Sequence, residues 1–500
     1  MDKNTGARVS TELTNAPAAL HEVEGGARRV LVLVAIPILA AIYCGIALVA
    51  QPEADAFVLL WILICALLLA VPLVLERRLD PFSPAFFFVF LRVQWVGKPC
   101  LETLFGSYSN RYLENLTQLE TFELLRGALV IVALGLFGYW VGYYGGVSRL
   151  LPEVRLGLPE RFHRRRLATL IVLLTCAVAF VYGLFIVQAG GFRAMWNVMG
   201  ERREVYAGVK VVGWVLDIAS LPLILLVVLR GDRRPRWLVP ACAALVLALA
   251  ATGDRSRALV PALIVIIFWH YSIRRIRPIL LMGLAFAIVV LAVAIRDLRG
   301  TSFGGREVDF TVIEESVTAP TLVVERFVLG RGTVDIIGVL LHLMPERLPF
   351  QHGATYIRAL VMPIPRALWP DKPLVDESGL VGRAFFGPDY YGLPVGTEGV
   401  LYMNFHLPGV LLGMIFLGAL HRRIYESLRA RLHSPAHVIL YACALYFLSA
   451  FTGIGLFNLA TIVVPVWLAL RFAGARGARA DSHDAAGSRT APAPVLDIPN

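Results

Sequence analysis

Apolar runs long enough to cross a bilayer recur along almost the whole of this 500-residue chain. A transmembrane helix needs roughly 20 apolar residues, and 57% of the residues are hydrophobic. Because a helix satisfies its own backbone hydrogen bonds in lipid, the sequence predicts an all-α polytopic membrane protein of about twelve transmembrane helices. The predicted spans lie near residues 30–50, 57–75, 82–97, 122–146, 167–189, 211–230, 237–252, 258–272, 279–296, 400–419, 436–452 and 455–472.

The run at 82–97 contains Arg92 and Gln94, so it either crosses the membrane or re-enters from one side. Cytoplasmic loops of membrane proteins carry an excess of Lys and Arg. If 82–97 crosses, the arginine-rich segments 147–166 and 422–431 fall on one side, together with both tails. We therefore predict that this run crosses and that both termini are cytoplasmic.

These spans divide the chain into five parts. A polar tail of residues 1–29 precedes a first bundle of about nine spans, residues 30–296. Residues 297–399 form one large loop on the side opposite the termini, and its apolar and aromatic residues predict a partly helical, ordered structure. Residues 400–472 supply about three C-terminal spans, and residues 473–500 form a second tail that is predicted, like the first, to be disordered.

The formal net charge of +11 does not indicate a nucleic-acid partner, because most charges lie at the ends of apolar runs. All but four of the 47 basic residues are arginine. Genomic base composition explains the total. At selected positions, however, arginine suits phosphate recognition, since its guanidinium donates two hydrogen bonds at once.

No residue pattern indicates a cofactor. The sequence lacks a phosphate-binding P-loop, a zinc-ligand spacing and a GxSxG nucleophile turn, and its six cysteines form no CxxC pair. The nearest approach to a metal-binding acidic pair is Glu53 and Asp55, in the first far-side loop. This pair supports only a secondary hypothesis of a metal site.

Two basic segments lie on the arginine-poor far side. Thr252–Arg257 joins two short apolar runs and is predicted to form a tight hairpin at the membrane surface. Arg255 and Arg257 lie beside the start of a helix, where the helix dipole favours an anion. We predict that they bind an anionic substrate; the alternative is an interfacial turn in which Asp254 pairs with one arginine.

The second basic segment is the loop 190–204, which holds Arg193, Arg202 and Arg203. These side chains are predicted to contribute to substrate binding.

Four prolines fix the segment 351–373 in an irregular extended path. That path presents Arg358, Arg366, Trp369 and Lys372. Cationic groups of this kind neutralise a phosphate, and an aromatic ring stacks on a sugar face. The alternative is a rigid surface loop with solvated charges.

Polar residues enter the next apolar run in the segment Gly396–Gly409. Glu398 and Tyr402 share one helix face at four-residue spacing. Either Glu398 or His406 is a candidate general base for a sugar hydroxyl, and His352 is a second histidine candidate. The alternative for a single histidine here is a packing role.

The order of these segments resembles that of the Wzy-type O-antigen and exopolysaccharide repeat-unit polymerases. The resemblance rests on the Gly253-Asp-Arg hairpin, on Ile364-Pro-Arg-Ala-Leu-Trp-Pro-Asp-Lys-Pro373 and on Gly396-Thr-Glu-Gly-Val-Leu-Tyr-Met-Asn-Phe405. The family often has Asn-Phe-Gly where this chain has Asn404-Phe-His406.

The resemblance implies glycosyl transfer at the periplasmic face of a bacterial inner membrane, without a cofactor. Undecaprenyl-diphosphate-linked glycans would serve as donor and acceptor, and a chain-length regulator is an implied partner. Arg255 and Arg366 would stabilise the leaving diphosphate, supported by Arg257, Arg358 and Lys372. Glu398 or His406 would deprotonate the acceptor.

Four alternatives stay open at this stage. An O-antigen ligase uses the same donor but transfers the glycan to lipid A core. A metal-dependent transferase would use Glu53 and Asp55. A transporter of lipid-linked oligosaccharides and a non-catalytic export partner belong to other functional classes, and the large ordered loop argues against the transporter.

Overall fold

The computed structural model describes most of the chain between residues 56 and 474. The described residues are 56–76, 79–105, 108–154, 156–159, 162–197, 215–216, 218–230, 238–301, 309–328, 333–362, 364, 368–369, 371–373, 376–388, 392–448 and 451–474. Their regular secondary structure is helical, apart from one isolated bridge between Phe162 and Gly474. The predicted first span, 30–50, lies outside the described residues.

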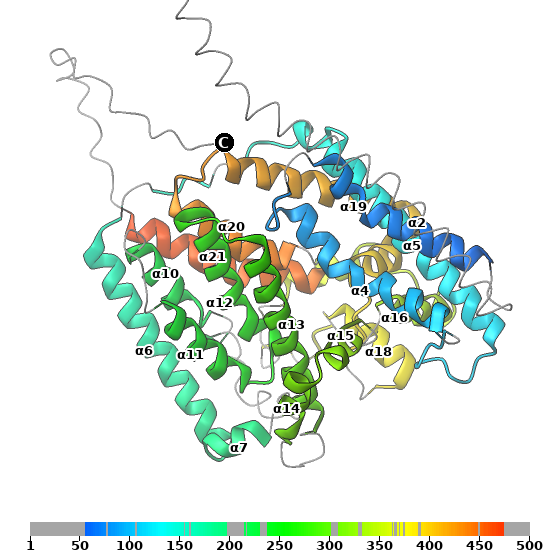
Figure 1. Cartoon of the computed structure of the whole chain (residues 1–500), viewed down its shortest axis with the longest axis horizontal. Helices are drawn as coiled ribbons and strands as arrows, with labels where there is room; N and C mark the ends of the chain where they lie inside the picture. Colours follow the sequence, from blue (N-terminus) through cyan, green and yellow to red (C-terminus); the bar gives the residue numbers. More distant parts are fainter. Residues whose placement is uncertain are drawn as a thin grey trace, which may run out of the picture.

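The helices form two bundles that lie side by side (Figure 1). The first bundle contains α6 (Arg164–Gln188), α10 (Leu221–Arg230), α11 (Leu238–Ala250), α12 (Arg255–Phe268) with the π-helical turn η2 (Trp269–Ile273), α13 (Pro278–Thr301), α20 (Pro435–Leu448) and α21 (Gly453–Ala473). The second contains α2 (Ala56–Leu69), α3 (Val71–Leu75), α4 (Pro84–Phe105), α5 (Gln118–Tyr144), α16 (Thr333–Leu343) and the N-terminal half of α19 (Gly396–Arg429).

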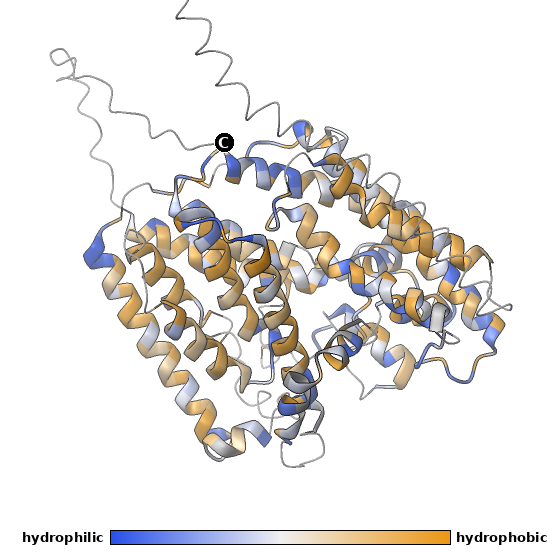
Figure 2. Cartoon of the chain, in the orientation of Figure 1, coloured by the Kyte–Doolittle hydropathy of each residue, from blue (hydrophilic) through white to orange (hydrophobic). Residues whose placement is uncertain are grey.

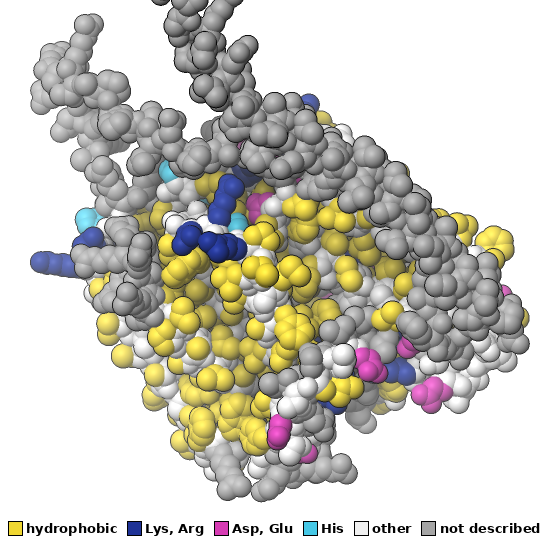
Figure 3. Space-filling view, viewed as in Figure 1, with side chains coloured by type: hydrophobic (Ala, Val, Ile, Leu, Met, Phe, Trp, Pro, Cys, Tyr) yellow, Lys and Arg dark blue, Asp and Glu magenta, His cyan; other side chains and the backbone are white. Residues whose placement is uncertain are grey.

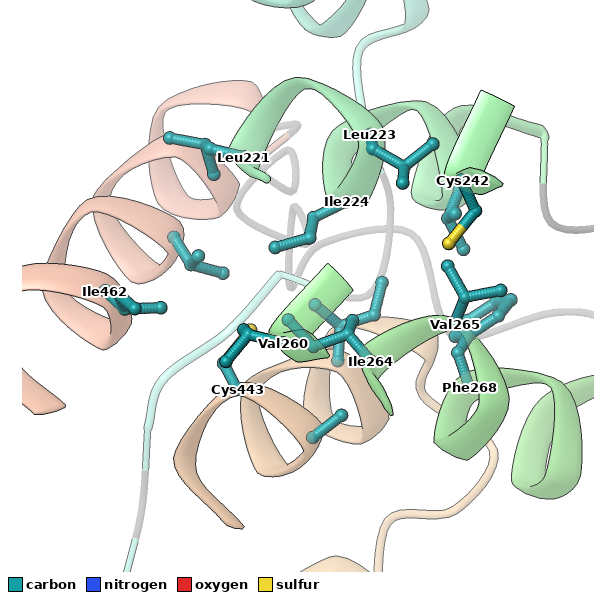
Figure 4. Packing of buried hydrophobic residues seen from close by; sticks show 14 of the residues in the cluster. Leu221, Leu223, Ile224, Cys242, Val260, Ile264, Val265, Phe268, Cys443 and Ile462 are labelled. Carbon is teal, nitrogen blue, oxygen red and sulfur yellow. The ribbon is translucent and has the colours of Figure 1, made fainter. Parts of the chain in front are cut away.

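Each bundle has its own apolar core. In the first, side chains of α10, α11, α12, α20 and α21 interdigitate, as the close view in Figure 4 shows for Ile224, Cys242, Ile264 and Cys443. In the second, α5 packs against α19 through glycines: a Cβ on Gly142 would lie 2.0 Å from the carbonyl oxygen of Ile415. Only a residue without a side chain allows this approach.

Six described helices are long and apolar enough to cross a membrane: α2 with α3, α5, α6, α13, α19 and α21. Shorter apolar helices are α11, α12 with η2, α16 and α20. Apolar residues cover the helix sides and polar residues gather at helix ends, such as the C-terminal end of α19 (Figure 2). The face in Figure 3 is likewise hydrophobic over the first bundle, with Lys and Arg along its upper border. A multi-pass membrane protein is therefore well supported.

Contacts between the segments that connect the helices show which of these segments lie at the same end of the bundles. At one end, Asp80 accepts hydrogen bonds from the hydroxyls of Tyr271 (2.7 Å) and Tyr425 (2.5 Å). At the other, which we call the loop end, Lys98 forms a buried ion pair with Asp335 of α16. The loop end also carries the short helices α14 (Thr311–Thr318), α15 (Pro320–Val328), α17 (Ala354–Leu360) and α18 (Glu377–Phe386), so the large loop is partly helical.

Helix α4 runs from one end to the other. The hydroxyl of Tyr441 donates a hydrogen bond to the carbonyl oxygen of Phe82, just before the helix begins, whereas Lys98 near its end reaches Asp335. Residues 84–105 thus form one continuous helix between the two ends rather than a re-entrant hairpin.

A strap joins the two bundles at the end opposite the loop end. It connects α5, through the short helix η1 (Val147–Leu150), to α6. Ser427 of α19 donates a hydrogen bond to the carbonyl oxygen of Val154 (3.0 Å), and the indole of Trp467 in α21 donates one to that of Leu156 (2.9 Å).

Candidate functional site

Two segments that the sequence singled out, 351–373 and 396–409, meet at the loop end. The backbone N–H of Gln351 donates to the carbonyl oxygen of Met403 (2.9 Å), and that of Gly353 donates to Oδ1 of Asn404 (2.9 Å). The amide group of Asn404 in turn donates to Oγ1 of Thr355 (2.9 Å) and to the carbonyl oxygen of Val400. The buried Asn404 side chain therefore fixes the loop against the first turns of α19.

Helix α19 is broken where this loop crosses it. Phe405 has φ −138° and ψ 17°, and His406 has φ 57° and ψ −159°, with Pro408 two residues later. A positive φ with an extended ψ is a conformation that glycine adopts readily and other residues rarely do. The break turns His406 outward, where its side chain is exposed.

Aromatic rings surround the His406 imidazole. Its ring centroid lies 5.0 Å from that of Tyr402 and 5.3 Å from that of Phe350. Arg358 lies on the same loop, half-buried, and its Nη1 donates to Oε1 of Gln351 (3.1 Å). The loop that carries Phe350 and Arg358 thus meets the exposed imidazole, and these residue types together suit the binding of a sugar and an anion.

Glu398 lies in a different environment from the one predicted for a general base. Its side chain has no exposed surface, and the guanidinium of Arg92 in α4 donates to both of its carboxylate oxygens, at 2.9 and 3.4 Å. The Arg92 guanidinium carbon lies 3.7 Å from the Phe88 ring centroid. A Cβ on Gly135 of α5 would lie 2.6 Å from Cγ of Glu398. The ion pair therefore ties α4, α5 and α19 together, and a substrate hydroxyl reaches Glu398 only if this packing opens.

The sequence did not identify Arg92 as part of a site, although its signal is present. A charge inside an apolar run is expensive in lipid and finds a partner in the protein interior. Arg92 is the charge that marks run 82–97, and Glu398 is the carboxylate at the entry of another run. The two residues are 306 positions apart in the sequence, so their pairing could not be predicted from the sequence alone.

The predicted hairpin between α11 and α12 is present. Gly253 has φ 71°, and the Thr252 hydroxyl donates back to the carbonyl oxygen of Leu249 (2.7 Å). Arg255 is the first residue of α12 and is exposed, whereas Nε of Arg257 lies 4.0 Å from Oδ2 of Asp254. Arg257 thus adopts the pairing of the alternative interpretation, and Arg255 is the arginine that faces outward. The hairpin belongs to the first bundle, because α12 packs against α20.

The other predicted binding residues have different outcomes. Lys372 is buried, and its ammonium donates to the carbonyl oxygens of Met362 (2.8 Å) and Ile364 (2.9 Å), which gives it a structural role in the proline-rich segment. Trp369 is partly exposed. The residues Arg366, Arg202 and Arg203 lie outside the described residues, as does the side chain of Arg193 at the start of α7 (Phe192–Asn197).

A buried carboxylate that the sequence analysis did not single out joins the large loop to α21. Glu377, the first residue of α18, accepts hydrogen bonds from the backbone N–H groups of Gly453 and of Ile454 (3.4 Å). Burial raises the pKa of Glu377 to about 7, against the opposing influence of these two N–H groups. A Cβ on Gly453 would lie 2.8 Å from the carbonyl oxygen of Thr355. Helices α17, α18 and α21 therefore meet at one point.

Among the described residues, no group of three or more His, Cys, Asp or Glu side chains is placed to hold a metal ion. Glu53 and Asp55, the residues of the secondary metal hypothesis, lie outside the described residues.

Comparison with known proteins adds no assignment: no protein-family model, curated protein or solved structure matches this chain.

Proposed function

We propose that this chain is a glycosyltransferase of the bacterial inner membrane that polymerises undecaprenyl-diphosphate-linked oligosaccharide repeat units at the periplasmic face. The observation that carries the proposal is His406: an exposed imidazole in a backbone conformation typical of glycine, between the rings of Tyr402 and Phe350, where the loop that carries Arg358 meets α19. A strained conformation at a surface position points to a functional constraint. The resemblance of segments 364–373 and 396–405 to the Wzy-type polymerases supplies the substrate class.

In the proposed reaction, His406 accepts the proton of an acceptor sugar hydroxyl. The hydroxyl oxygen then bonds to the anomeric carbon of the donor glycan, and the bond from that carbon to the diphosphate oxygen breaks. The lipid diphosphate leaves with the bonding electrons, and the anomeric configuration inverts. The leaving group is already activated, so the reaction needs no nucleotide.

Arginines are assigned to the developing charge on the diphosphate. We place Arg358 first, because it donates to the side chain of Gln351, whose backbone N–H bonds the carbonyl oxygen of Met403 just before the break in α19. Arg255 and Arg366 keep the role that the resemblance gives them, and Arg257, Arg193, Arg202 and Arg203 remain proposed binding residues. Trp369 is proposed to stack on a sugar ring.

Glu398 is the weaker candidate for the base. A general base has to come within hydrogen-bond reach of the proton it removes, and Glu398 is enclosed and paired with Arg92. We therefore propose that Glu398 positions α19, and that His406 carries out the proton transfer.

The test is deletion of the gene followed by sizing of the surface and lipid-linked glycans on gels. Single repeat units on lipid A or on the lipid carrier would support a polymerase. Full-length chains stalled on the carrier would identify a ligase instead. Unchanged glycans would overturn both and reopen the transporter class. Complementation with His406→Ala, with His352→Ala as the comparison, then tests the assignment of the base.

A further inference from the structure

Large apolar side chains are exposed in a part of the chain that lies outside the apolar spans. Leu360 and Leu368 are each 79% exposed, and Ile357, Ile364 and Trp369 are also exposed. We call these five residues the 357–369 patch. They follow one another within the large loop, where water would be the default surrounding, and soluble surfaces seldom gather so many apolar side chains.

The exposure is built into the fold. Helix α17 turns its other face inward, where Thr355 and Ala359 are buried. Ala359 Cβ lies against Gly453 at the start of α21, at 3.2 Å from the position of a Cβ there. The hydroxyl of Tyr356 donates to the carbonyl oxygen of Phe451 (3.3 Å). The helix therefore cannot roll to bury its apolar face.

Several described backbone groups of the patch are paired within the loop. The N–H groups of Val361, Met362 and Ile364 each donate to the carbonyl oxygen three residues earlier in the chain. The carbonyl oxygens of Met362 and Ile364 both accept from the ammonium of Lys372. Paired backbone groups are what a segment needs in order to leave water, because an unpaired polar group in lipid costs several kcal/mol.

The patch continues the apolar outer surface of a long helix. On α19, Phe405, Leu412 and Phe416 are exposed. The Phe416 ring centroid lies 5.8 Å from that of Phe451, which lies 5.9 Å from that of Tyr356 in α17. Gly353, just before α17, lies against the Phe405 ring, at 3.1 Å from the position of a Cβ. Half-buried aromatic rings thus connect the exposed apolar side chains of α19 to α17.

We propose that the 357–369 patch inserts into the far leaflet of the bilayer and anchors the large loop at the level of the lipid headgroups. Lipid is the occupant that the continuity with α19 indicates. Trp369 fits this position, since tryptophan is enriched at membrane interfaces, and at the level of the headgroups its ring is also within reach of the sugar of a lipid-linked substrate. Arg358 lies between Ile357 and Leu360 on the same helix, half-buried, so its guanidinium would lie at the depth of the phosphates. The anchor holds independently of the proposed reaction.

The experiment uses the full-length chain reconstituted in vesicles of phosphatidylethanolamine and phosphatidylglycerol. Cys44, Cys100 and Cys176 are replaced by Ser, because the other cysteines, Cys65, Cys242 and Cys443, are buried. A single cysteine is then introduced as Leu360→Cys or Leu368→Cys and labelled with a fluorophore. Glu346→Cys is the matched control, an exposed residue of the same loop outside the patch. A single symmetric peak in size-exclusion chromatography verifies folding before labelling.

The expected result is several-fold stronger quenching at 360 and 368 by lipids with a nitroxide on the acyl chain than at 346, and several-fold weaker quenching by aqueous iodide. Equal iodide quenching at all three positions would overturn the proposal, because the patch would then be in water. Shielding of 360 and 368 from both quenchers would also overturn it, since a second copy of the chain or another protein would then be the occupant.

Discussion

His406 combines two properties that rarely occur together, an exposed imidazole and a backbone conformation that favours glycine. Residues held in such a region cost of order 1–3 kcal/mol, and the cost persists when function or packing demands it. Asn404 fixes the chain before the break through its hydrogen bonds, and Pro408 after it has no N–H to continue the helix, so neither feature depends on the residue at position 406. The break therefore does not require a histidine, and the side chain itself needs another explanation.

The variant His406→Gly removes the imidazole while it keeps the backbone conformation, so it tests the two properties of His406 separately. Relief of the positive φ, less the entropy that glycine loses on folding, is expected to raise stability by about 1 kcal/mol. Glycan polymerisation is expected to fall to background, because the proposed base is gone. A thermal midpoint in detergent and a gel ladder of products from reconstituted protein measure the two effects. His352→Gly is the matched comparison, since His352 also has a positive φ of 46°. Retained polymerisation in His406→Gly would exclude His406 as the base.

Variants of Arg92 and Glu398 distinguish a structural role of this ion pair from a catalytic role of Glu398. Arg92→Ala leaves a buried carboxylate unpaired and is expected to cost about 3–5 kcal/mol. The double variant Arg92→Met, Glu398→Leu removes both charges and is expected to recover most of that loss. Thermal midpoints of the single and double variants measure it. If the double variant folds and still polymerises glycans, Glu398 is not the base. If it folds but is inactive, while His406→Ala is active, the roles proposed for the two residues are reversed.

The sequence predicted the local structure of two candidate segments correctly, because that structure depends on neighbouring residues. The hairpin at 252–257 and the polar entry of α19 follow from residues next to each other in the chain. The partner of Glu398 and the buried position of Lys372 did not follow. Each depends on a contact that folding creates, with Arg92 across 306 residues and with two carbonyl oxygens of an irregular loop. A charged residue in an apolar segment indicates that it needs a partner in the folded protein, but the sequence does not identify that partner.

At the scale of elements, the docking of α18 on α21 depends on one carboxyl group. Glu377 is enclosed at the first turn of α21, where the helix dipole favours an anion but burial disfavours one. Burial is the larger influence and raises the pKa of Glu377 from 4.5 to about 7. The nearby acid Asp376 acts in the same direction. The folded protein therefore holds this proton more tightly than the unfolded chain does.

The resulting pH dependence has a definite sign. Because the folded pKa is above the unfolded one, the stabilisation is full below pH 4.5 and is lost as the pH rises through about 7. Its upper bound is about 3 kcal/mol. The thermal midpoint of the wild type is expected to fall between pH 5 and pH 8 by more than that of Glu377→Gln, which keeps an acceptor for Gly453 and cannot ionise. Equal pH dependence in both proteins would show that Glu377 does not titrate in this range.

At the scale of the whole molecule, the alternation of charged loops predicts which connecting segments share a side of the membrane, and this topology stays a prediction. The structure places Asp80, Tyr271 and Tyr425 together at one end of the bundles, and Lys98 with Asp335 at the other. The prediction of about twelve spans is matched only in part. Six helices among the described residues have the necessary length and apolarity, and shorter ones such as α11 pack within the first bundle. Hydropathy reports how apolar a segment of sequence is. The position of a short apolar helix depends instead on the neighbours against which it is buried.

The orientation of the two ends is the prediction on which the proposed function depends. Glu346 at the loop end and Ala430 at the opposite end are both exposed. In cells with a permeabilised outer membrane, Glu346→Cys is expected to react with a membrane-impermeant maleimide, and Ala430→Cys only after the inner membrane is lysed, because Lys and Arg concentrate in cytoplasmic loops. Reaction at both positions before lysis would contradict a membrane between the two ends. Reaction at 430 alone would place His406 and Arg358 in the cytoplasm, where nucleotide-activated sugars are available and transfer between lipid-linked glycans would lose its rationale.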